Sequence, residues 1–202
     1  CVLERTFCPW HMSSQYESIQ DPSLYAEAFH VAAPASPVGR EIWQRQPGVF
    51  IRQGPVQAVT APEVTPTAEQ PEPPIRAIPT RELVVGQFGL VPNWVKSASD
   101  AKLRSTKLVN ARSETVTTSN NFRDAWMNGQ RCIVPMMAFV EDDWRSGKAV
   151  PTRIARVDGK PMGVAGLWES WTGTEGEVIT SYTLLPVSAH RHALIHRYQP
   201  PG

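Results

Sequence analysis

The chemically distinctive residue of this sequence is Cys1, at the head of CVLERTF. A cysteine in first position carries two nucleophiles on adjacent carbons, an α-amine with a pKa of about 7.7–8.0 and a thiol with a pKa of about 8.5. Both groups are partly deprotonated near neutral pH, so a small shift in environment makes either one reactive. Taken alone, however, Cys1 favours the plainer interpretation that it only marks where the given chain starts.

Two further positions have side chains suited to chemistry, Asn110 in NARSE and Glu141 at the end of IVPMMAFVE. The NARSE segment lies in the most basic stretch of the chain, 96–116, although by itself it also suits an ordinary turn or helix entry. Glu141 closes an apolar segment, where desolvation would raise a carboxyl pKa toward the range of a general acid or base. The acids that follow it at 142 and 143 fit the alternative, a solvated strand end.

Three histidines lie close together in AHRHALIH, at 190, 192 and 196. His192 and His196 are one helical turn apart and could share a metal ion, but a zinc enzyme also needs a third ligand and an activating carboxylate, and no H-E-x-x-H occurs. We therefore expect no metal and no cofactor, and a general acid or base, or a surface histidine, is the preferred interpretation. The sequence also lacks a P-loop, a G-x-G-x-x-G motif after a strand and a G-x-S-x-G motif.

Composition restricts the class of protein and its partners. The 202 residues, 41% hydrophobic and 19% charged, are typical of one globular core, and the net charge of +1 means that any polyanion site must be a local patch. Three cysteines without C-x-x-C spacing indicate a reducing compartment. No apolar run reaches membrane-spanning length and no signal-peptide pattern opens the chain. We expect a soluble, cytoplasmic protein that does not enter membranes.

Strands dominate the expected secondary structure. A short helix is expected over 21–34, with Asp21 as its N-cap, and a second over 119–130, ending at Gly129. The remaining periodic segments favour strands: 41–59 with turns at Pro47-Gly48 and Gly54-Pro55, 81–95, 131–141 running into a loop, 152–171 with a hairpin turn at Asp158-Gly159, and 177–189. Residues 60–79 are rich in proline and predict an extended surface loop.

This order of elements lacks a βαβ rhythm and internal repeats. It predicts an α+β fold, a single domain over 1–202 built on a curled, mainly antiparallel, barrel-like sheet flanked by a few helices.

Five segments, together with Cys1, resemble the SOS response-associated peptidase (SRAP) family: FGLVPNW, VNARSET, FRDAW, RCIVPMMAFVE and GVAGLWE follow the N-terminal cysteine in the family's order. The resemblance spans most of 87–169. It implies a protein that binds single-stranded DNA and captures the ring-opened aldehyde of an abasic site, in the DNA damage response. The amine of Cys1 would form an imine with the aldehyde, and the thiol would close a five-membered thiazolidine.

The resemblance also implies roles for particular residues. Asn110 would hydrogen-bond the cysteine or the opened sugar, and Glu141 would shuttle protons during ring opening and imine formation. Pro92 and Trp94 would form a wedge at the lesion, and Arg112 would bind phosphate. The full set of residues that we expect to bind DNA is Arg5, Pro92, Trp94, Arg112, Phe122 and Arg123.

The sequence departs from the family at three places. Val2 and Leu3 follow Cys1 where many members have Gly-Arg, which leaves Arg5 for any basic contact. The segment PMMAFVEDD replaces a pattern like P-A-D-G-F-Y-E-W. The family's catalytic histidine falls on Gln199, which cannot act as an acid or base at neutral pH, so either His196 serves in its place or that function is lost.

Two other functions fit the same residues. A cysteine peptidase or autopeptidase would use Cys1 as nucleophile with Glu141 and a histidine, and a degenerate module would bind single-stranded DNA without a covalent step. The basic stretch 94–112 with its tryptophan distinguishes DNA binding from peptidase action, because a peptidase does not need it. The expected partner is single-stranded DNA containing abasic sites, and we expect a monomer.

Overall fold

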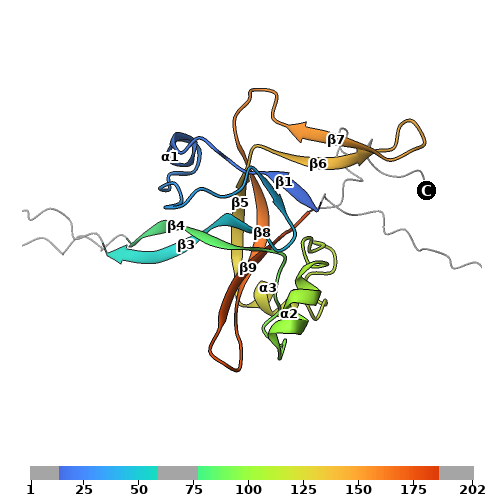
Figure 1. Cartoon of the computed structure of the whole chain (residues 1–202). Helices are drawn as coiled ribbons and strands as arrows, with labels where there is room; N and C mark the ends of the chain where they lie inside the picture. The colour runs from blue at the N-terminus through green and yellow to red at the C-terminus, as the bar shows by residue number, and fades with distance from the viewer. Residues whose placement is uncertain (1–13, 59–76, 187–202) are drawn as a thin grey trace, which may run out of the picture.

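The computed structural model describes residues 14–58 and 77–186. Their elements, in chain order, are β1 (Gln15–Glu17), α1 (Ser23–Phe29), β2 (Glu41–Trp43), β3 (Pro47–Ala58), β4 (Ala77–Phe88), α2 (Ala98–Ser105), α3 (Arg123–Met127), β5 (Arg131–Met136), β6 (Ala138–Asp143), β7 (Val150–Ala155), β8 (Met162–Thr172) and β9 (Val178–Leu184). Most of the regular secondary structure is sheet, and the helices lie at its margins (Figure 1).

Five strands form a closed barrel in the order β3-β4-β9-β8-β5. Neighbouring strands are antiparallel except β4 and β9, which pair in parallel at Gln87↔Ser181 and Phe88↔Tyr182. The barrel closes between β3 and β5 through one residue pair, Ile51↔Ile133. This closure is much shorter than the six-residue pairing of β5 with β8.

The other four strands form an antiparallel sheet in the order β2-β1-β6-β7. The chain passes from the barrel to this sheet at Met137, between β5 and β6. Its strand β1 pairs with β6 at Tyr16↔Phe139 and Glu17↔Ala138. The backbone N–H of Met137 also donates to the carbonyl of Glu17, at 2.8 Å, so β1 is fastened at the point where the chain changes sheets.

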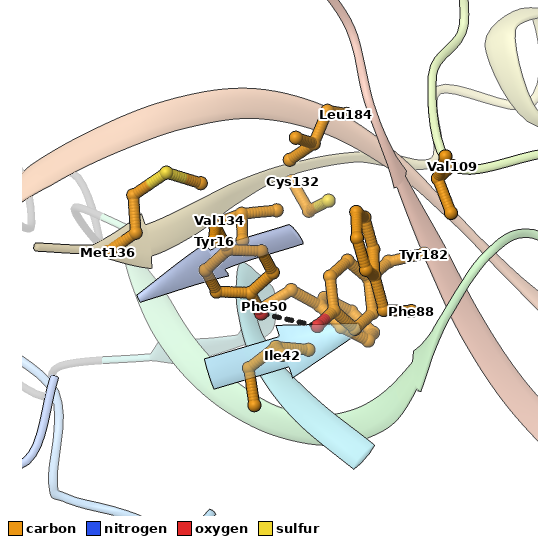
Figure 2. Packing of buried hydrophobic residues seen from close by; sticks show 10 residues of the cluster. All are labelled: Tyr16, Ile42, Phe50, Phe88, Val109, Cys132, Val134, Met136, Tyr182 and Leu184. Carbon is orange, nitrogen blue, oxygen red and sulfur yellow. Dashed lines mark hydrogen bonds between the residues drawn. The ribbon is translucent and has the colours of Figure 1, made fainter. Parts of the chain in front are cut away.

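The main core cluster joins the sheet to the barrel through aromatic side chains (Figure 2). Tyr16, from β1, meets the Phe88 ring edge-on with centroids 5.3 Å apart. The ring of Tyr182, from β9, packs against Phe88 at 5.5 Å and Phe50 at 5.4 Å. All four rings are buried, which is where such large apolar surfaces contribute most.

The helices are short, and contacts between residues close together in the sequence stabilise or end them. The hydroxyl of Ser97 accepts from the backbone N–H of Asp100 at 3.2 Å and so caps α2. Within α2, Nε of Arg104 donates to both carboxylate oxygens of Asp100, at 2.8 Å each, the i, i+4 spacing that supports a helix. Helix α3 ends just before Gly129, whose φ of 71° is a conformation that glycine adopts without strain.

The expected fold class is confirmed, while several details were wrong. Gly54-Pro55 is not a turn but lies within β3, at a register shift between Gln53 and Val56, and Pro47-Gly48 begins that strand. The segment after Met136 continues as strand β6 instead of a loop. Asp158-Gly159 does form a turn, but it is not a hairpin because β7 pairs with β6 and β8 pairs with β5 and β9.

Two more boundaries differ from expectation. Residues 77–79 belong to β4, so the proline-rich segment ends earlier than 79, and its residues 60–76 lie outside the described part. Helix α2 was not expected at all, because its sequence ASDAKLRS carries little apolar periodicity. The cap of α1 is Pro22 instead of Asp21, whose carboxylate accepts from the N–H of Ser23 at 3.0 Å.

Candidate functional site

The segment around Asn110 runs beside the end of β9. Asn110 forms an isolated parallel bridge with Leu184. The N–H of Leu184 donates to the carbonyl of Val109 at 2.9 Å, and the N–H of Ala111 donates to the carbonyl of Leu184 at 2.7 Å. Val109, Ala111 and Leu184 are buried, and Oδ1 of Asn110 is buried as well. The backbone therefore holds this amide side chain in one place, as a positioned hydrogen-bonding group requires.

Arg112 lies two residues further, where the chain turns away from β9. Its carbonyl accepts from the N–H of Thr115 at 3.2 Å, and the N–H of Ser113 donates to the carbonyl of Pro186 at 3.4 Å. The side chain of Arg112 is half-buried. Asn110 and Arg112 thus belong to the same short segment. Asn110 lies beside the end of β9, and Arg112 lies at the start of the turn that follows.

Glu141 lies in β6, opposite Thr152 of β7, and is half-buried. Side chains two apart on a strand share a face, so Glu141 lies on the same face as Phe139, which packs against the main core cluster. Val109 belongs to that cluster too. Asn110 follows a residue of this cluster, Val109, and Glu141 shares a strand face with a residue packed against it, Phe139, although 31 positions separate Asn110 and Glu141 in the sequence.

The acid at 143 is not a freely solvated strand end. Asp143 is buried, and its carboxylate accepts from the backbone N–H of Arg145 at 2.9 Å and from the guanidinium of the same residue. These hydrogen bonds hold the pKa of Asp143 below its ordinary value. Asp142, between this pair and Glu141, is exposed.

Trp94 is an exposed ring with a fixed orientation. Its side chain is 40% exposed, and its Nε1–H donates to the carbonyl of Asn120 at 2.9 Å. The guanidinium carbon of Arg104 lies 4.7 Å from the ring centroid, and Asp100 holds that guanidinium in turn. A held indole with exposed surface suits stacking against a flat ligand such as a nucleobase.

Two of the other residues expected to bind DNA are buried in the protein. Phe122, only 7% exposed, belongs to a second core cluster with Leu90 and Leu167, so no base can stack on it. Pro92 is buried as well, and its carbonyl accepts from the N–H of Val95 at 3.2 Å, which forms the turn that presents Trp94. Arg123 is exposed beside Asp124, at 3.5 Å.

Helix α2 contributes to the surface around Trp94, which the sequence did not lead us to expect. Arg104 backs the Trp94 ring, and the surface charges of the 96–116 stretch include Lys102 and Lys107, which are exposed. The available signals were the S-x-x-D cap at 97–100 and the Asp100–Arg104 spacing. With five basic residues against two acids, 96–116 has an excess of three positive charges and is a local patch on a nearly neutral chain.

Cys1, Arg5, His196 and Gln199 lie outside the described residues, as does the histidine group at 190–196. Within residues 14–58 and 77–186, no three His, Cys, Asp or Glu side chains gather as a metal site would require. No helix in those same ranges is long and apolar enough to cross a membrane.

Comparison with known proteins gives one family and several relatives. The family model described as "SOS response associated peptidase (SRAP)" matches residues 12–200. "Abasic site processing protein YoaM" of Bacillus subtilis is 33% identical over 102 residues, which are 49% of this chain and 42% of that protein. "Abasic site processing protein HMCES" of Gallus gallus is 26% identical over 140 residues, 59% of this chain and 41% of that protein.

A crystal structure of a Bordetella bronchiseptica protein has the same fold, with a TM-score of 0.72 and 34% sequence identity. The likeness covers 94% of this chain and 79% of that one. The chain spans about two fifths of the length of the two curated relatives.

Proposed function

Because this chain belongs to the SOS response-associated peptidase family, we propose that it processes abasic sites: it binds single-stranded DNA and captures the lesion covalently through Cys1. The names of the relatives support abasic-site processing. The observation that supports DNA binding is the exposed ring of Trp94. Its Nε1–H donates to the carbonyl of Asn120, and the guanidinium of Arg104, a residue of the basic stretch 96–116, packs against the ring. A peptidase acting on its own N-terminus has no need of such a surface.

The covalent step balances with one water lost. The α-amine of Cys1 adds to the aldehyde carbon of the ring-opened sugar, and the resulting carbinolamine loses water to give an imine. The Sγ of Cys1 then adds to the imine carbon while its proton passes to the nitrogen, which closes a thiazolidine. The reaction requires a free α-amine at Cys1, because an internal cysteine cannot form this ring.

The described residues have distinct parts in this proposal. Asn110, held beside Leu184, would hydrogen-bond the opened sugar or the cysteine. Glu141 would carry protons between the sugar ring oxygen, the carbinolamine and solvent. Arg112 would accept the phosphate next to the lesion through its planar fork of donors. Trp94 would stack on a neighbouring base, a contribution of about 1–3 kcal/mol without sequence preference.

The test uses a labelled single-stranded oligonucleotide with one abasic site, incubated with the protein and analysed on a denaturing gel. Intact mass first establishes that the protein in the tube begins with a free Cys1. We expect a shifted band that survives denaturation, disappears with Cys1→Ala and persists with Cys8→Ala. Cys132 provides an internal control, since burial raises the pKa of its thiol and encloses it.

The alternatives give different results in the same assay. A non-covalent binding module would retard the oligonucleotide on a native gel, with or without Cys1, and give no band on the denaturing gel. A peptidase would remove residues preceding Cys1, seen by mass, without a DNA adduct. Glu141→Gln, His196→Ala and Gln199→Ala then compare the candidate acid–base groups by the rate of band formation.

A further inference from the structure

The barrel has a groove at its short closure, between β3 and β5. Strands β3 and β5 pair only at Ile51↔Ile133, and the space of about 400 Å³ beside this pair is lined by both strands and by Arg81 of β4. In Figure 1 the β3–β4 hairpin extends from β5 on the side opposite to α2. The residues that line the groove do not include Trp94 or Arg104.

Three arginines line the groove, and each has its guanidinium held by a specific contact. Nη1 of Arg81 donates to the carbonyl of Phe29, at 2.9 Å. The guanidinium carbon of Arg131 lies 4.2 Å from the centroid of the Trp126 ring. That of Arg52 lies 4.5 Å from the Trp168 ring. A guanidinium that is already oriented loses less freedom on binding an anion, so the groove is pre-organised for one.

The charges of the groove do not cancel. Glu82 accepts from Nε of Arg52 at 2.9 Å and balances that arginine. Among the contacts of the described residues 14–58 and 77–186, those of Arg81 and Arg131 are to a neutral carbonyl and a neutral ring, which leave their positive charges in excess there. Each guanidinium has five N–H donors, and one carbonyl uses a single donor of Arg81.

Besides the three arginines, the lining has two polar residues, Gln53 and Thr80, and three apolar ones, Ile51, Cys132 and Ile133. Ile51 and Cys132 are buried beneath the groove, and Ile133 is an exposed aliphatic side chain at its edge. Oriented cationic groups above an apolar floor match a ligand with a phosphate at one end and a flat or aliphatic body at the other. A space of about 400 Å³ lies within the range of small-ligand sites.

We propose that this groove binds the phosphate group of a nucleotide, with Arg81 and Arg131 on the phosphate and the base or sugar over Ile51 and Ile133. The nucleotide can be free or part of a DNA strand, since both present the same phosphate. The groove does not use Cys1, so this proposal goes beyond the proposed function and does not depend on its covalent step.

The experiment is done on the full chain carrying Cys1→Ala, so that no adduct forms. Thymidine monophosphate, inorganic phosphate and an undamaged oligothymidylate are titrated separately by calorimetry. We expect Arg81→Gln and Arg131→Gln each to weaken monophosphate binding about tenfold, the effect of removing one charge-assisted contact. Arg156→Gln is the matched control, because it removes an exposed arginine that pairs only locally with Asp158. Binding by the oligonucleotide but not by the monophosphate assigns the groove to a strand, and the reverse assigns it to free nucleotide.

Equal weakening by Arg156→Gln, or no weakening by either groove variant, overturns the proposal. Chemical-shift mapping of the protein with unaltered arginines provides a test that does not depend on how the variants fold. The amides of Arg81, Arg131 and Ile133 must shift with monophosphate, and shifts confined to 94–112 would contradict the assignment. A groove variant that still crosslinks an abasic site separates this proposal from the proposed function.

Discussion

The hydroxyls of Tyr16 and Tyr182 lie 2.5 Å apart in the core and join the two sheets of the protein (Figure 2). Tyr16 comes from β1 of the four-stranded sheet and Tyr182 from β9 of the barrel. Tyr16 is also the first buried residue after the chain enters the described part at Ser14. This hydrogen bond therefore positions β1 relative to β9, the strand that carries Leu184 beside Asn110.

The losses from removing the two hydroxyls of this pair should not add. Tyr182→Phe leaves the Tyr16 hydroxyl buried without the partner that it has in the native protein, which costs about 1–3 kcal/mol of unfolding free energy. Tyr16→Phe should behave similarly, and the double variant should lose less than the sum of the two single losses. Urea unfolding of all four proteins measures this coupling. Strict additivity would show that the two hydroxyls do not interact.

Gly48 should not tolerate a side chain. A Cβ at this position would lie 2.0 Å from the Tyr182 hydroxyl and 2.6 Å from that of Tyr16, inside a packed core. We expect Gly48→Ala to lower the unfolding free energy by about 1–3 kcal/mol through overpacking. Gly39→Ala is the matched control, because its Cβ would meet its nearest neighbour at 3.4 Å. A Gly48→Ala protein as stable as the Gly39→Ala protein would contradict this packing.

Alkali should destabilise the protein from about pH 10 upward. Burial raises the pKa values of Tyr16, Tyr182 and Tyr25 above the ordinary value of 10.0, so the folded state keeps phenolic protons that the unfolded chain releases. The folded state then binds more protons, and the unfolding free energy falls as pH rises, by up to about 1.4 kcal/mol per pH unit for each such group. Thermal unfolding between pH 8 and pH 11 measures the slope. The Tyr16→Phe/Tyr182→Phe double variant should have a shallower slope than the wild type.

An ion pair between β1 and β7 of the four-stranded sheet should be lost in acid, whereas the buried tyrosines destabilise the protein in alkali. Nε and Nη2 of Arg153 donate to the two carboxylate oxygens of Glu17, at 2.6 and 2.7 Å, and these hydrogen bonds lower the pKa of Glu17 below 4.5. The pair contributes stability above about pH 4.5, and that contribution disappears as pH falls through the folded-state pKa. Because both groups are partly exposed, Glu17→Gln should cost at most about 1 kcal/mol at pH 7. The difference from wild type should shrink as pH falls through the folded-state pKa of Glu17, and a difference that does not change with pH would assign it to packing.

Trp94 should matter for DNA and not for folding. Trp94→Ala should weaken binding of an undamaged single-stranded oligonucleotide by about 1–3 kcal/mol, the loss of one stacked base. Trp43→Ala is a closely matched control, since Trp43 is 42% exposed, against 40% for Trp94, and lies on β2. Fluorescence anisotropy at fixed salt measures both variants. An equal loss of oligonucleotide affinity in the two variants would contradict a specific contact between Trp94 and DNA.

Much of the architecture was predictable because its signals are local. Alternating and β-branched segments predicted most strands, and Gly129 predicted the end of α3. The segment NARSE and the apolar run before Glu141 also marked their sites, although each fits a plainer structural role. Local signals failed at α2, where polar residues form a helix through Ser97 and Asp100 without an apolar stripe.

The sequence by itself determined the residue types able to do the chemistry, the strand-rich composition and the family, since all three depend on side-chain identity and spacing along the chain. Only the tertiary structure decided which of these residues are exposed and which belong to the core: it buries Phe122, exposes Trp94 and brings Asn110 beside Leu184. It also formed the three-arginine groove from β3, β4 and β5. The physical reason is that strand pairing and barrel closure join segments far apart in the sequence, and no local propensity encodes such partners.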